Sequence, residues 1–291
     1  MTIAKKRRPA DIARGFLLLT HPIPVLFHTI AVTVFVLLAV WSHFIWSTIV
    51  LLIAAHIAMQ LSISFLNDYC DRHLDALSKR NKPIPQGLVY PREALILGLF
   101  MIVVMVLLLL PLNLPALLIS LLYLTFGQGY NLGLKSTPLS GIVFALAIPL
   151  IPLYAFVGVG HILPILFWLV PVGALLGVAL NLANSLPDIE EDAAHGARTL
   201  AVALGVGRSN LTCSLLILLS IIAIGVLTAT HLVPASTLIV LPTLVLSCIA
   251  VCGMLLFFGP RKPVPTGKPY FYLVVSTCLL LAGGWLIGAL I

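Results

Sequence analysis

The chain consists of long apolar stretches that short polar segments separate. About 20 consecutive apolar residues are enough for a helix to cross the hydrocarbon core of a bilayer. By this criterion the sequence predicts nine spans, at residues 22–40, 47–66, 92–110, 114–130, 138–158, 162–183, 208–228, 234–257 and 270–290. The expected fold class is therefore all-α: a polytopic membrane protein whose nine transmembrane helices form one bundle around a central cavity.

Two of the predicted spans are less regular than the others. Gly127, Gly129 and Asn131 interrupt the end of the fourth span, and Pro171 lies within the sixth. Broken or polar helices at membrane depth usually line a cavity rather than lipid. We therefore expect these two spans to face the interior of the bundle.

The composition excludes an ordinary soluble protein. The chain is 61% hydrophobic and 9% charged, whereas soluble domains carry about 25% charged residues. No polar block is long enough to form a separate soluble domain, so residues 1–291 are expected to form a single integral-membrane domain. Residues 1–15 form a basic N-terminal segment, and no short apolar run with a small-residue cleavage site follows it, which argues against a removable signal peptide.

The basic residues predict the orientation of the chain. All sixteen Lys and Arg residues fall before the first span or around the loops that follow the second, fourth, sixth and eighth spans. Positively charged loops mark the cytoplasmic side. We therefore expect a multi-pass protein of the cell (inner) membrane with a cytoplasmic N-terminus and its C-terminus on the opposite side. The net charge of +7 is then an orientation signal and in part an anion site, so no nucleic-acid partner is expected.

The acidic residues are concentrated in two clusters. Seven of the nine acidic residues lie there, and each cluster contains the pattern Asn-x3-Asp-x3-Asp at the cytoplasmic end of an even-numbered span. Its members are Asn67, Asp71 and Asp75 in the first cluster and Asn184, Asp188 and Asp192 in the second. Residues at i, i+4 and i+8 share one helical face, so each cluster predicts a polar stripe on a helix. The repetition suggests two related halves.

Such stripes require a countercharge. Like charges at i, i+4 destabilise a helix, and carboxylates close to hydrocarbon are costly. Carboxylate and amide oxygens suit Mg²⁺, which completes its shell with water and phosphate oxygens, and no His/Cys set suited to zinc is present. Basic residues adjoin both clusters, so the sequence predicts a site for a diphosphate with an apolar tail. They are Arg72, Lys79, Arg80, Lys82, Lys135 and Arg198.

Three segments of the chain, within roughly residues 15–290, resemble the UbiA-type intramembrane prenyltransferases. The first signature of that family is similar to Asn67-Asp68-x2-Asp71-x3-Asp75 followed by Asn81-Lys82-Pro83-Ile84-Pro85-Gln86-Gly87. The second is similar to Asn184-x3-Asp188-x3-Asp192 followed by Gly196-Ala197-Arg198-Thr199-Leu200. The segment Tyr130-Asn131-Leu132-Gly133-Leu134-Lys135 resembles the Tyr-Ser-x-x-x-Lys segment after the fourth span. Lys82 and Asn131 stand where many members have Arg and Ser, which bears on the subfamily.

The resemblance implies a reaction and its residues. A prenyl group would pass from a prenyl diphosphate donor to a small aromatic or lipid acceptor within the membrane, and diphosphate would be released. Two Mg²⁺ ions would be held by Asp68, Asp71, Asp75, Asp188 and Asp192, with Asn67 and Asn184 as amide ligands. The diphosphate would be bound by Arg80, Lys82, Lys135 and Arg198, and the allylic cation stabilised by Tyr130, Asn131 and Phe126.

Two other functions remain open at this point. A terpene cyclase of the same fold would act on a prenyl diphosphate without an acceptor. A cation-coupled transporter is disfavoured because the carboxylates lie at one rim rather than at the midplane. The sequence leaves open the acceptor, the length of the prenyl chain, the oligomeric state and the roles of Glu190, Glu191, His73 and His195.

Overall fold

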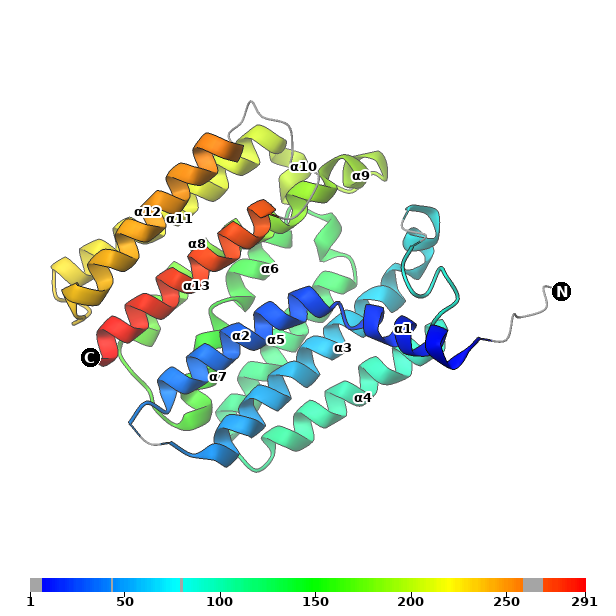
Figure 1. The fold of residues 1–291 in the computed structure, drawn as a ribbon, viewed down its shortest axis with the longest axis horizontal. Coiled ribbons are helices and arrows are strands. Elements are labelled where there is room, and N and C mark those ends of the chain that lie inside the picture. The colour runs from blue at the N-terminus through cyan, green and yellow to red at the C-terminus, as the bar shows by residue number, and fades with distance from the viewer. Residues whose placement is uncertain (1–6, 43, 79–80, 259–268) are drawn as a thin grey trace. The chain divides into compact units, whose positions relative to one another are not determined.

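A computed structural model describes residues 7–42, 44–78, 81–258 and 269–291 of the chain (Figure 1). All regular elements in these ranges are helical. They are α1 (Pro9–Leu19), α2 (Pro22–Ala39), α3 (Trp46–Ser78), α4 (Pro91–Leu109), α5 (Leu114–Asn131), η1 (Leu134–Ser136), α6 (Ser140–Ala147), α7 (Leu150–Val159), α8 (Ile165–Ser185), η2 (Leu186–Asp188), α9 (Ile189–Ala194), α10 (Leu200–Leu204), α11 (Val206–Ala229), α12 (Thr237–Phe258) and α13 (Pro269–Leu290). The prediction of an all-α chain is confirmed.

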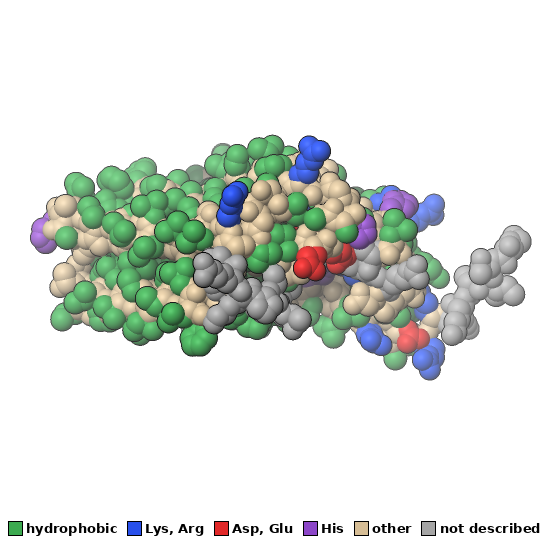
Figure 2. Space-filling view, turned by 90° about the horizontal axis from the view of Figure 1, so that it is seen from above, with side chains coloured by type: hydrophobic (Ala, Val, Ile, Leu, Met, Phe, Trp, Pro, Cys, Tyr) green, Lys and Arg blue, Asp and Glu red, His purple; other side chains and the backbone are tan. Residues whose placement is uncertain are grey.

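The surface of the protein is that of a multi-pass membrane protein. Within the described ranges, eight helical segments are long and apolar enough to span a bilayer. On α4, five large side chains that follow one another along the helix are between 51% and 65% exposed; they are Ile96, Leu99, Phe100, Val103 and Leu107. Hydrophobic side chains cover most of the face seen in Figure 2. An apolar surface of this extent is unfavourable in water and favourable in lipid.

The eight segments coincide with eight of the nine predicted spans. The predicted fourth span, at residues 114–130, forms α5, a helix of 18 residues. It is not among the eight because its last turn carries Gln128, Tyr130 and Asn131, which lower its hydropathy. The predicted fifth span folds as two helices, α6 and α7, which Ile148 and Pro149 separate.

Helix α3 is longer than the apolar stretch that predicted it. The expected span ends at residue 66, but the helix continues to Ser78 and has 33 residues. At 1.5 Å per residue it is about 50 Å long, well beyond the roughly 30 Å of a hydrocarbon core. The first acidic motif therefore lies on one uninterrupted helix, as its i, i+4, i+8 spacing predicted.

The same expectation is wrong for the second acidic motif. Helix α8 ends at Ser185, a 3₁₀ turn follows over Leu186–Asp188, and α9 begins at Ile189. The cause is Pro187, because proline has no N–H to donate and its ring clashes with the carbonyl of residue i−4. Asn184, Asp188 and Asp192 therefore do not share one helical face.

The chain divides into two compact units. The first consists of Met1–Thr33 and Trp46–Leu132, and the second of Val34–Ile45 and Gly133–Ile291. In the first unit α3 packs against α4 and α5. Gly127 of α5 allows this close approach, since a Cβ there would lie 2.6 Å from Cδ1 of Ile63 on α3.

Small residues have the same use in the second unit, where α8 packs against α6, α11 and α13. A Cβ on Gly177 of α8 would lie 2.7 Å from the carbonyl carbon of Phe144 on α6. A Cβ on Gly284 of α13 would lie 2.7 Å from Cγ2 of Thr243 on α12. These glycines therefore serve close helix packing inside the unit.

Candidate functional site

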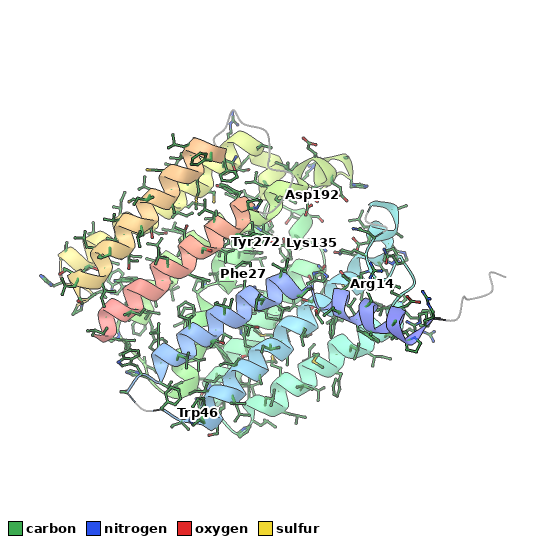
Figure 3. The ribbon with its side chains drawn as sticks, in the orientation of Figure 1. Arg14, Phe27, Trp46, Lys135, Asp192 and Tyr272 are labelled. Carbon is green, nitrogen blue, oxygen red and sulfur yellow. The ribbon has the colours of Figure 1, made fainter. Side chains whose placement is uncertain are left out.

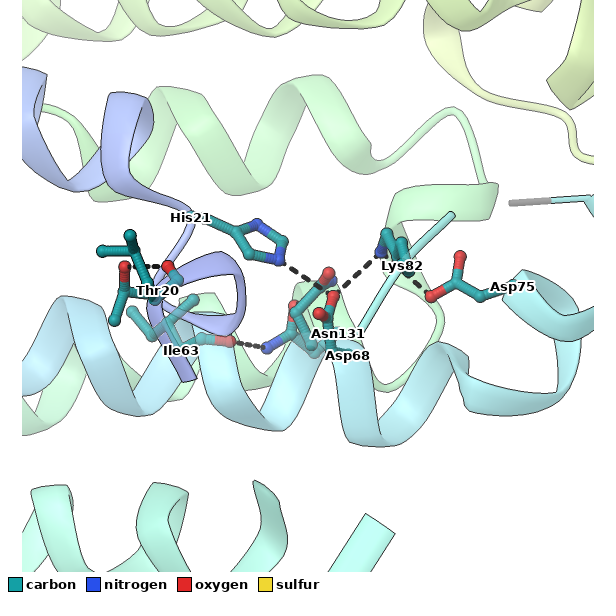
Figure 4. Close-up of polar contacts among 9 residues, drawn as sticks. Thr20, His21, Ile63, Asp68, Asp75, Lys82 and Asn131 are labelled. Carbon is teal, nitrogen blue, oxygen red and sulfur yellow. Dashed lines mark hydrogen bonds and ion pairs between the residues drawn. The ribbon is translucent and has the colours of Figure 1, made fainter. Parts of the chain in front are cut away.

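The first acidic motif is a compact ion-pair cluster at the C-terminal end of α3. The ammonium nitrogen of Lys82 lies 2.9 Å from Oδ1 of Asp68 and 2.9 Å from Oδ2 of Asp75 (Figure 4). The side chains of Asp68 and Asp75 are only 1% and 5% exposed, and that of Lys82 is 22% exposed. One lysine therefore balances two buried carboxylates that lie two turns apart on the same helix.

The charge of Lys82 follows from these contacts. Burial by itself lowers the pKa of Lys82, but the carboxylates of Asp68 and Asp75 outweigh that effect and raise the pKa above its ordinary value of 10.5. The side chain therefore remains an ammonium ion throughout the neutral range.

A tight loop holds Lys82 in place. The backbone N–H of Gln86 donates to the carbonyl of Lys82 at 3.1 Å, and that of Leu88 donates to the carbonyl of Pro83 at 3.0 Å. Gly87 has a φ of 69°, a left-handed conformation that glycine adopts without a Cβ clash. Val89 then anchors the end of the loop in a small apolar core with Leu19, Phe65 and Ala94.

The N-terminal segment closes over this loop. Both guanidinium nitrogens of Arg7 donate to the carboxylate of Glu93, at 2.7 and 2.6 Å, and one of them also donates to the carbonyl of Leu88 at 2.9 Å. The guanidinium group lies 3.7 Å from the centre of the Tyr90 ring. Bidentate pairs of this kind are strong and directional. The segment that the sequence identified only as basic thus fixes the position of the Lys82 loop.

His21 is a site residue that the sequence did not identify. It lies between α1 and α2, and its Nε2–H donates to Oδ1 of Asp68 at 2.9 Å (Figure 4). Its φ is 48°, a left-handed conformation that costs a non-glycine residue of order 1–3 kcal/mol. The only sequence signal was a polar residue directly before Pro22, at the start of the first span.

The oxygens of the first motif fit a hard cation. Oδ2 of Asp68 is buried and has no hydrogen-bond partner among the described residues. Asn67 donates its amide hydrogen to Oδ1 of Asn131 at 2.9 Å, which leaves the Asn67 amide oxygen available. One or two carboxylates with a neutral oxygen are the set that Mg²⁺ prefers when water and phosphate complete its shell. In the part of the chain that the structure describes, no group of three or more His, Cys, Asp or Glu residues could hold a metal alone.

Asn131, a predicted substrate contact, forms hydrogen bonds that join α5 to α3. Its amide nitrogen donates to the carbonyl of Ile63 at 2.9 Å and to Oε1 of Gln128 at 3.3 Å. Its oxygen accepts the hydrogen bond from Asn67. These contacts orient Asn67. The predicted aromatic residues Phe126 and Tyr130 are half-buried on the same helix.

The second acidic motif lies in the second unit. Asn184 is near the end of α8, Asp188 is in η2 and Asp192 is in α9, and all three are half-buried. Oε1 of Glu191 is buried without a hydrogen-bond partner among the described residues, whereas Glu190 is exposed. Glu191 thus offers a further carboxylate oxygen within this motif.

Two of the predicted diphosphate contacts belong to neighbouring segments of this unit. The N–H of Arg198 donates to the carbonyl of Ser136 at 2.8 Å, which joins the segment after α9 to η1, the helix of Lys135. Lys135 and Asp192 are labelled in Figure 3. The hydroxyl of Ser140 donates to Oδ1 of Asn181 at 3.2 Å and so ties α6 to α8. Neither Ser140 nor Asn181 was predicted, because each is a single polar residue in an apolar stretch.

Four further residues were named from the sequence. Arg80, a predicted diphosphate contact, lies outside the described residues. Asp71 is half-buried on α3, and His73 is exposed. His195 is exposed, and its Nδ1–H donates to the carbonyl of Glu191 at 2.8 Å, a local contact at the end of α9.

Comparison with known proteins gives a family match over most of the chain. The model of the UbiA prenyltransferase family matches residues 26–275. A digeranylgeranylglyceryl phosphate synthase from Pyrococcus furiosus is 32% identical over 160 residues, which cover 54% of this chain and 57% of that protein. A 4-hydroxybenzoate octaprenyltransferase from Neisseria meningitidis is 32% identical over 147 residues, 48% of each chain. The matched region thus spans about half the length of these relatives.

Solved structures share the fold. A UbiA homologue from Archaeoglobus fulgidus, solved bound to GPP and Mg²⁺, superimposes with a TM-score of 0.74 at 16% identity, over 94% of this chain and 99% of that one. A digeranylgeranylglyceryl phosphate synthase structure gives a TM-score of 0.73 at 17% identity, over 96% and 99% of the two chains. At sequence identities of 16% and 17%, these structures show a shared fold and nothing further about this chain.

Proposed function

The chain belongs to the UbiA prenyltransferase family, and from this premise we propose that it transfers a prenyl group from a prenyl diphosphate to an acceptor inside the membrane. The observation that carries the proposal is the first acidic motif. Two buried carboxylates share one lysine there, and the second oxygen of Asp68 has no protein partner among the described residues. Such an arrangement at the end of an apolar helix suits a cation and an anionic headgroup.

The acidic motifs would hold Mg²⁺, two ions in all; a homologue from Archaeoglobus fulgidus was solved bound to GPP and Mg²⁺. The ligands would be Asn67, Asp68, Asp71 and Asp75 in the first motif and Asn184, Asp188 and Asp192 in the second. When bound, Mg²⁺ neutralises diphosphate oxygens and makes the diphosphate a better leaving group.

The basic residues would bind the diphosphate and stabilise the charge that develops on it. The carbon–oxygen bond of the donor breaks, and the diphosphate leaves with the electron pair. Preorganised cations aimed at such a charge lower the barrier by several kcal/mol. We assign this role to Arg80, Lys82, Lys135 and Arg198.

The rings of Tyr130 and Phe126 would stabilise the resulting allylic cation, at roughly 0.5–2 kcal/mol each. Asn131 would contribute by orienting Asn67. The acceptor nucleophile forms the new bond to carbon and then releases a proton.

The names of the relatives include a glyceryl phosphate synthase and a hydroxybenzoate prenyltransferase. We infer an acceptor from one of these two chemical classes, a lipid alcohol or an aromatic ring.

The topology follows from the loop charges. We infer nine spans with α5 as the fourth, because α5 fills the predicted position and has 18 residues. One integral-membrane domain in the cell membrane, with both acidic motifs and the N-terminus on the cytoplasmic side, agrees with the placement of all sixteen basic residues.

A purified preparation with Mg²⁺, a panel of prenyl diphosphates and a native lipid extract tests the function, with products identified by mass spectrometry. Asp71→Ala and Asp188→Ala should each reduce transfer by roughly 100-fold or more, on the scale of losing one charge-stabilising group. Glu190→Ala is the control, because Glu190 is exposed. Unchanged transfer in the Asp71 or Asp188 variant at saturating Mg²⁺ would contradict the proposal.

The same assay separates the alternatives. A cyclic hydrocarbon or alcohol formed from the diphosphate alone would identify a terpene cyclase. Cation flux into vesicles without release of diphosphate would identify a transporter.

A further inference from the structure

A second polar cluster lies in the first unit, within the apolar stretches of α2, α3 and α5. It consists of His28 on α2, His56 and Gln60 on α3 and Tyr123 on α5. His56, Gln60 and Tyr123 are 2%, 6% and 7% exposed. Polar side chains inside membrane-spanning segments are costly and usually functional, so this cluster requires an explanation beyond packing.

The four side chains form one connected group. The amide nitrogen of Gln60 lies 3.3 Å from Nε2 of His56 and donates to the hydroxyl of Tyr123 at 3.2 Å. The ring centres of His28, His56 and Tyr123 are between 5.8 and 6.3 Å apart in every pairing. In this arrangement Nε2 of His56 accepts an amide hydrogen of Gln60.

Hydrogen-bonding capacity is left over in this group. Both bonds of Gln60 use the same end of its amide, so the oxygen has no partner among the described residues. Tyr123 accepts from Gln60, and its own hydrogen has no acceptor in the described part of the chain. Nδ1 of His28 is likewise buried without a partner there. Turning the Gln60 amide over would use the Tyr123 hydrogen but leave the NH₂ end without an acceptor.

A buried group without a partner, such as Nδ1 of His28, costs about 1–3 kcal/mol. The Gln60 oxygen and the Tyr123 hydroxyl hydrogen leave an acceptor and a donor side by side in the first unit. A hydroxyl group of a ligand would satisfy both, because it accepts from Tyr123 and donates to Gln60.

The cluster lies within reach of the first acidic motif. Gln60 precedes Asn67 by seven residues on the same face of α3, which is about 10 Å along the helix. Both residues bond to α5, Gln60 to Tyr123 and Asn67 to Asn131. A ligand of the size of a substituted aromatic ring spans this distance.

We propose that His28, His56, Gln60 and Tyr123 form a subsite for the hydroxyl group of an uncharged, membrane-soluble acceptor. The assignment to an acceptor rests on the proposed transferase function. A carboxylate or phosphate does not suit the subsite, since the group contains only an amide, a phenol and two imidazoles.

Photolabelling tests the subsite without requiring turnover. The full chain in lipid nanodiscs is irradiated with 4-hydroxybenzophenone or with benzophenone, which lacks the hydroxyl, and the labelled peptides are mapped by mass spectrometry. The hydroxylated probe should half-saturate labelling of α2, α3 and α5 at a concentration roughly tenfold lower than benzophenone, as expected for one or two hydrogen bonds. Equal labelling by both probes would overturn the proposal.

Variants locate the effect at these side chains. The Gln60→Leu/Tyr123→Phe double variant should lose the preference for the hydroxylated probe, and Ser120→Ala should keep it. Ser120 is a matched control, since it is buried on α5 about one turn before Tyr123. Tyr123→Phe alone, which removes a single oxygen, serves if the double variant does not fold. A preference that persists in the variants overturns the proposal.

A transfer assay separates this inference from the proposed function. With an acceptor that bears a hydroxyl, the double variant should raise the KM for the acceptor about tenfold and leave the KM for the diphosphate unchanged. Transfer with an unchanged acceptor KM would overturn the subsite and leave the function standing. Preferential binding of the hydroxylated probe, without diphosphate release from any prenyl diphosphate, would support the hydroxyl site and overturn its assignment to an acceptor.

Discussion

Replacing Lys82 with methionine tests whether this one ammonium group neutralises both carboxylates of the first motif. Asp68 and Asp75 are almost completely buried, and Lys82 is their shared partner at 2.9 Å from each. Removing one partner of a buried ion pair costs about 3–5 kcal/mol. Because the Lys82 side chain is 22% exposed, we expect the lower end of that range. For a chain of this length, 3 kcal/mol corresponds to roughly 6–12 °C in the midpoint of thermal unfolding.

The assay is thermal unfolding of the detergent-solubilised protein without Mg²⁺. Arg92→Met is the control, because Arg92 is exposed and the loss of an exposed charge costs at most about 1 kcal/mol. Lys82→Arg should retain most of the stability. Combining Lys82→Met with Asp68→Asn and Asp75→Asn should restore most of it, because no buried charge is then left unpaired. A Lys82→Met midpoint equal to that of the Arg92 control, or no recovery in the triple variant, would refute the reasoning.

Three further predictions follow from the structure. The pKa of Lys82 is raised in the folded protein, so its ion pairs stabilise the fold fully at any pH below the ordinary lysine pKa and lose their effect only as the pH rises through the raised pKa. The difference between the unfolding midpoints of wild type and Lys82→Met should therefore stay constant from neutral pH to about pH 10. A decline of this difference near neutral pH would contradict the prediction. Gly177→Ala should lower the free energy of unfolding by about 1–3 kcal/mol, because its Cβ would lie 2.7 Å from a backbone carbon of α6. Gly225→Ala is the control and should be neutral in the same chemical denaturation experiment, because its Cβ would lie 3.6 Å from the nearest atom. His21→Leu removes the donor to Asp68 and should raise the KM for prenyl diphosphate roughly tenfold with partial rescue in His21→Gln; steady-state kinetics with an unchanged donor KM would show that His21 does not position the carboxylate.

The helices could be predicted from the sequence because hydrocarbon imposes a length and an apolar composition on each span. Eight of the predicted spans are present for this reason. The extension of α3 to Ser78 was also implied, because the spacing of Asn67, Asp71 and Asp75 is that of a helix face. The break at Pro187 could have been predicted from its ring alone, but the matching spacing of the second motif suggested a continuous helix instead.

The contacts that complete the site could not be predicted in this way. His21 meets Asp68 across 47 residues of sequence, and Arg7 meets Glu93 across 86. Each depends on how whole helices pack, and the local pattern around these residues contains no sign of a partner. The polar group around Gln60 was missed because its members stand singly in apolar stretches, where one histidine or tyrosine resembles an ordinary interfacial residue.

The two acidic motifs differ mechanically, because one lies on an unbroken helix and the other does not. Any rotation or tilt of the apolar part of α3 is transmitted directly to Asp68 and Asp75, since the same backbone hydrogen-bond ladder continues through them. In contrast, the 3₁₀ turn between α8 and α9 allows Asp192 to change direction while α8 stays in place. Under the proposed transferase function, exchange of product for new donor should therefore rearrange residues 186–194 and leave the spacing of the α3 carboxylates constant.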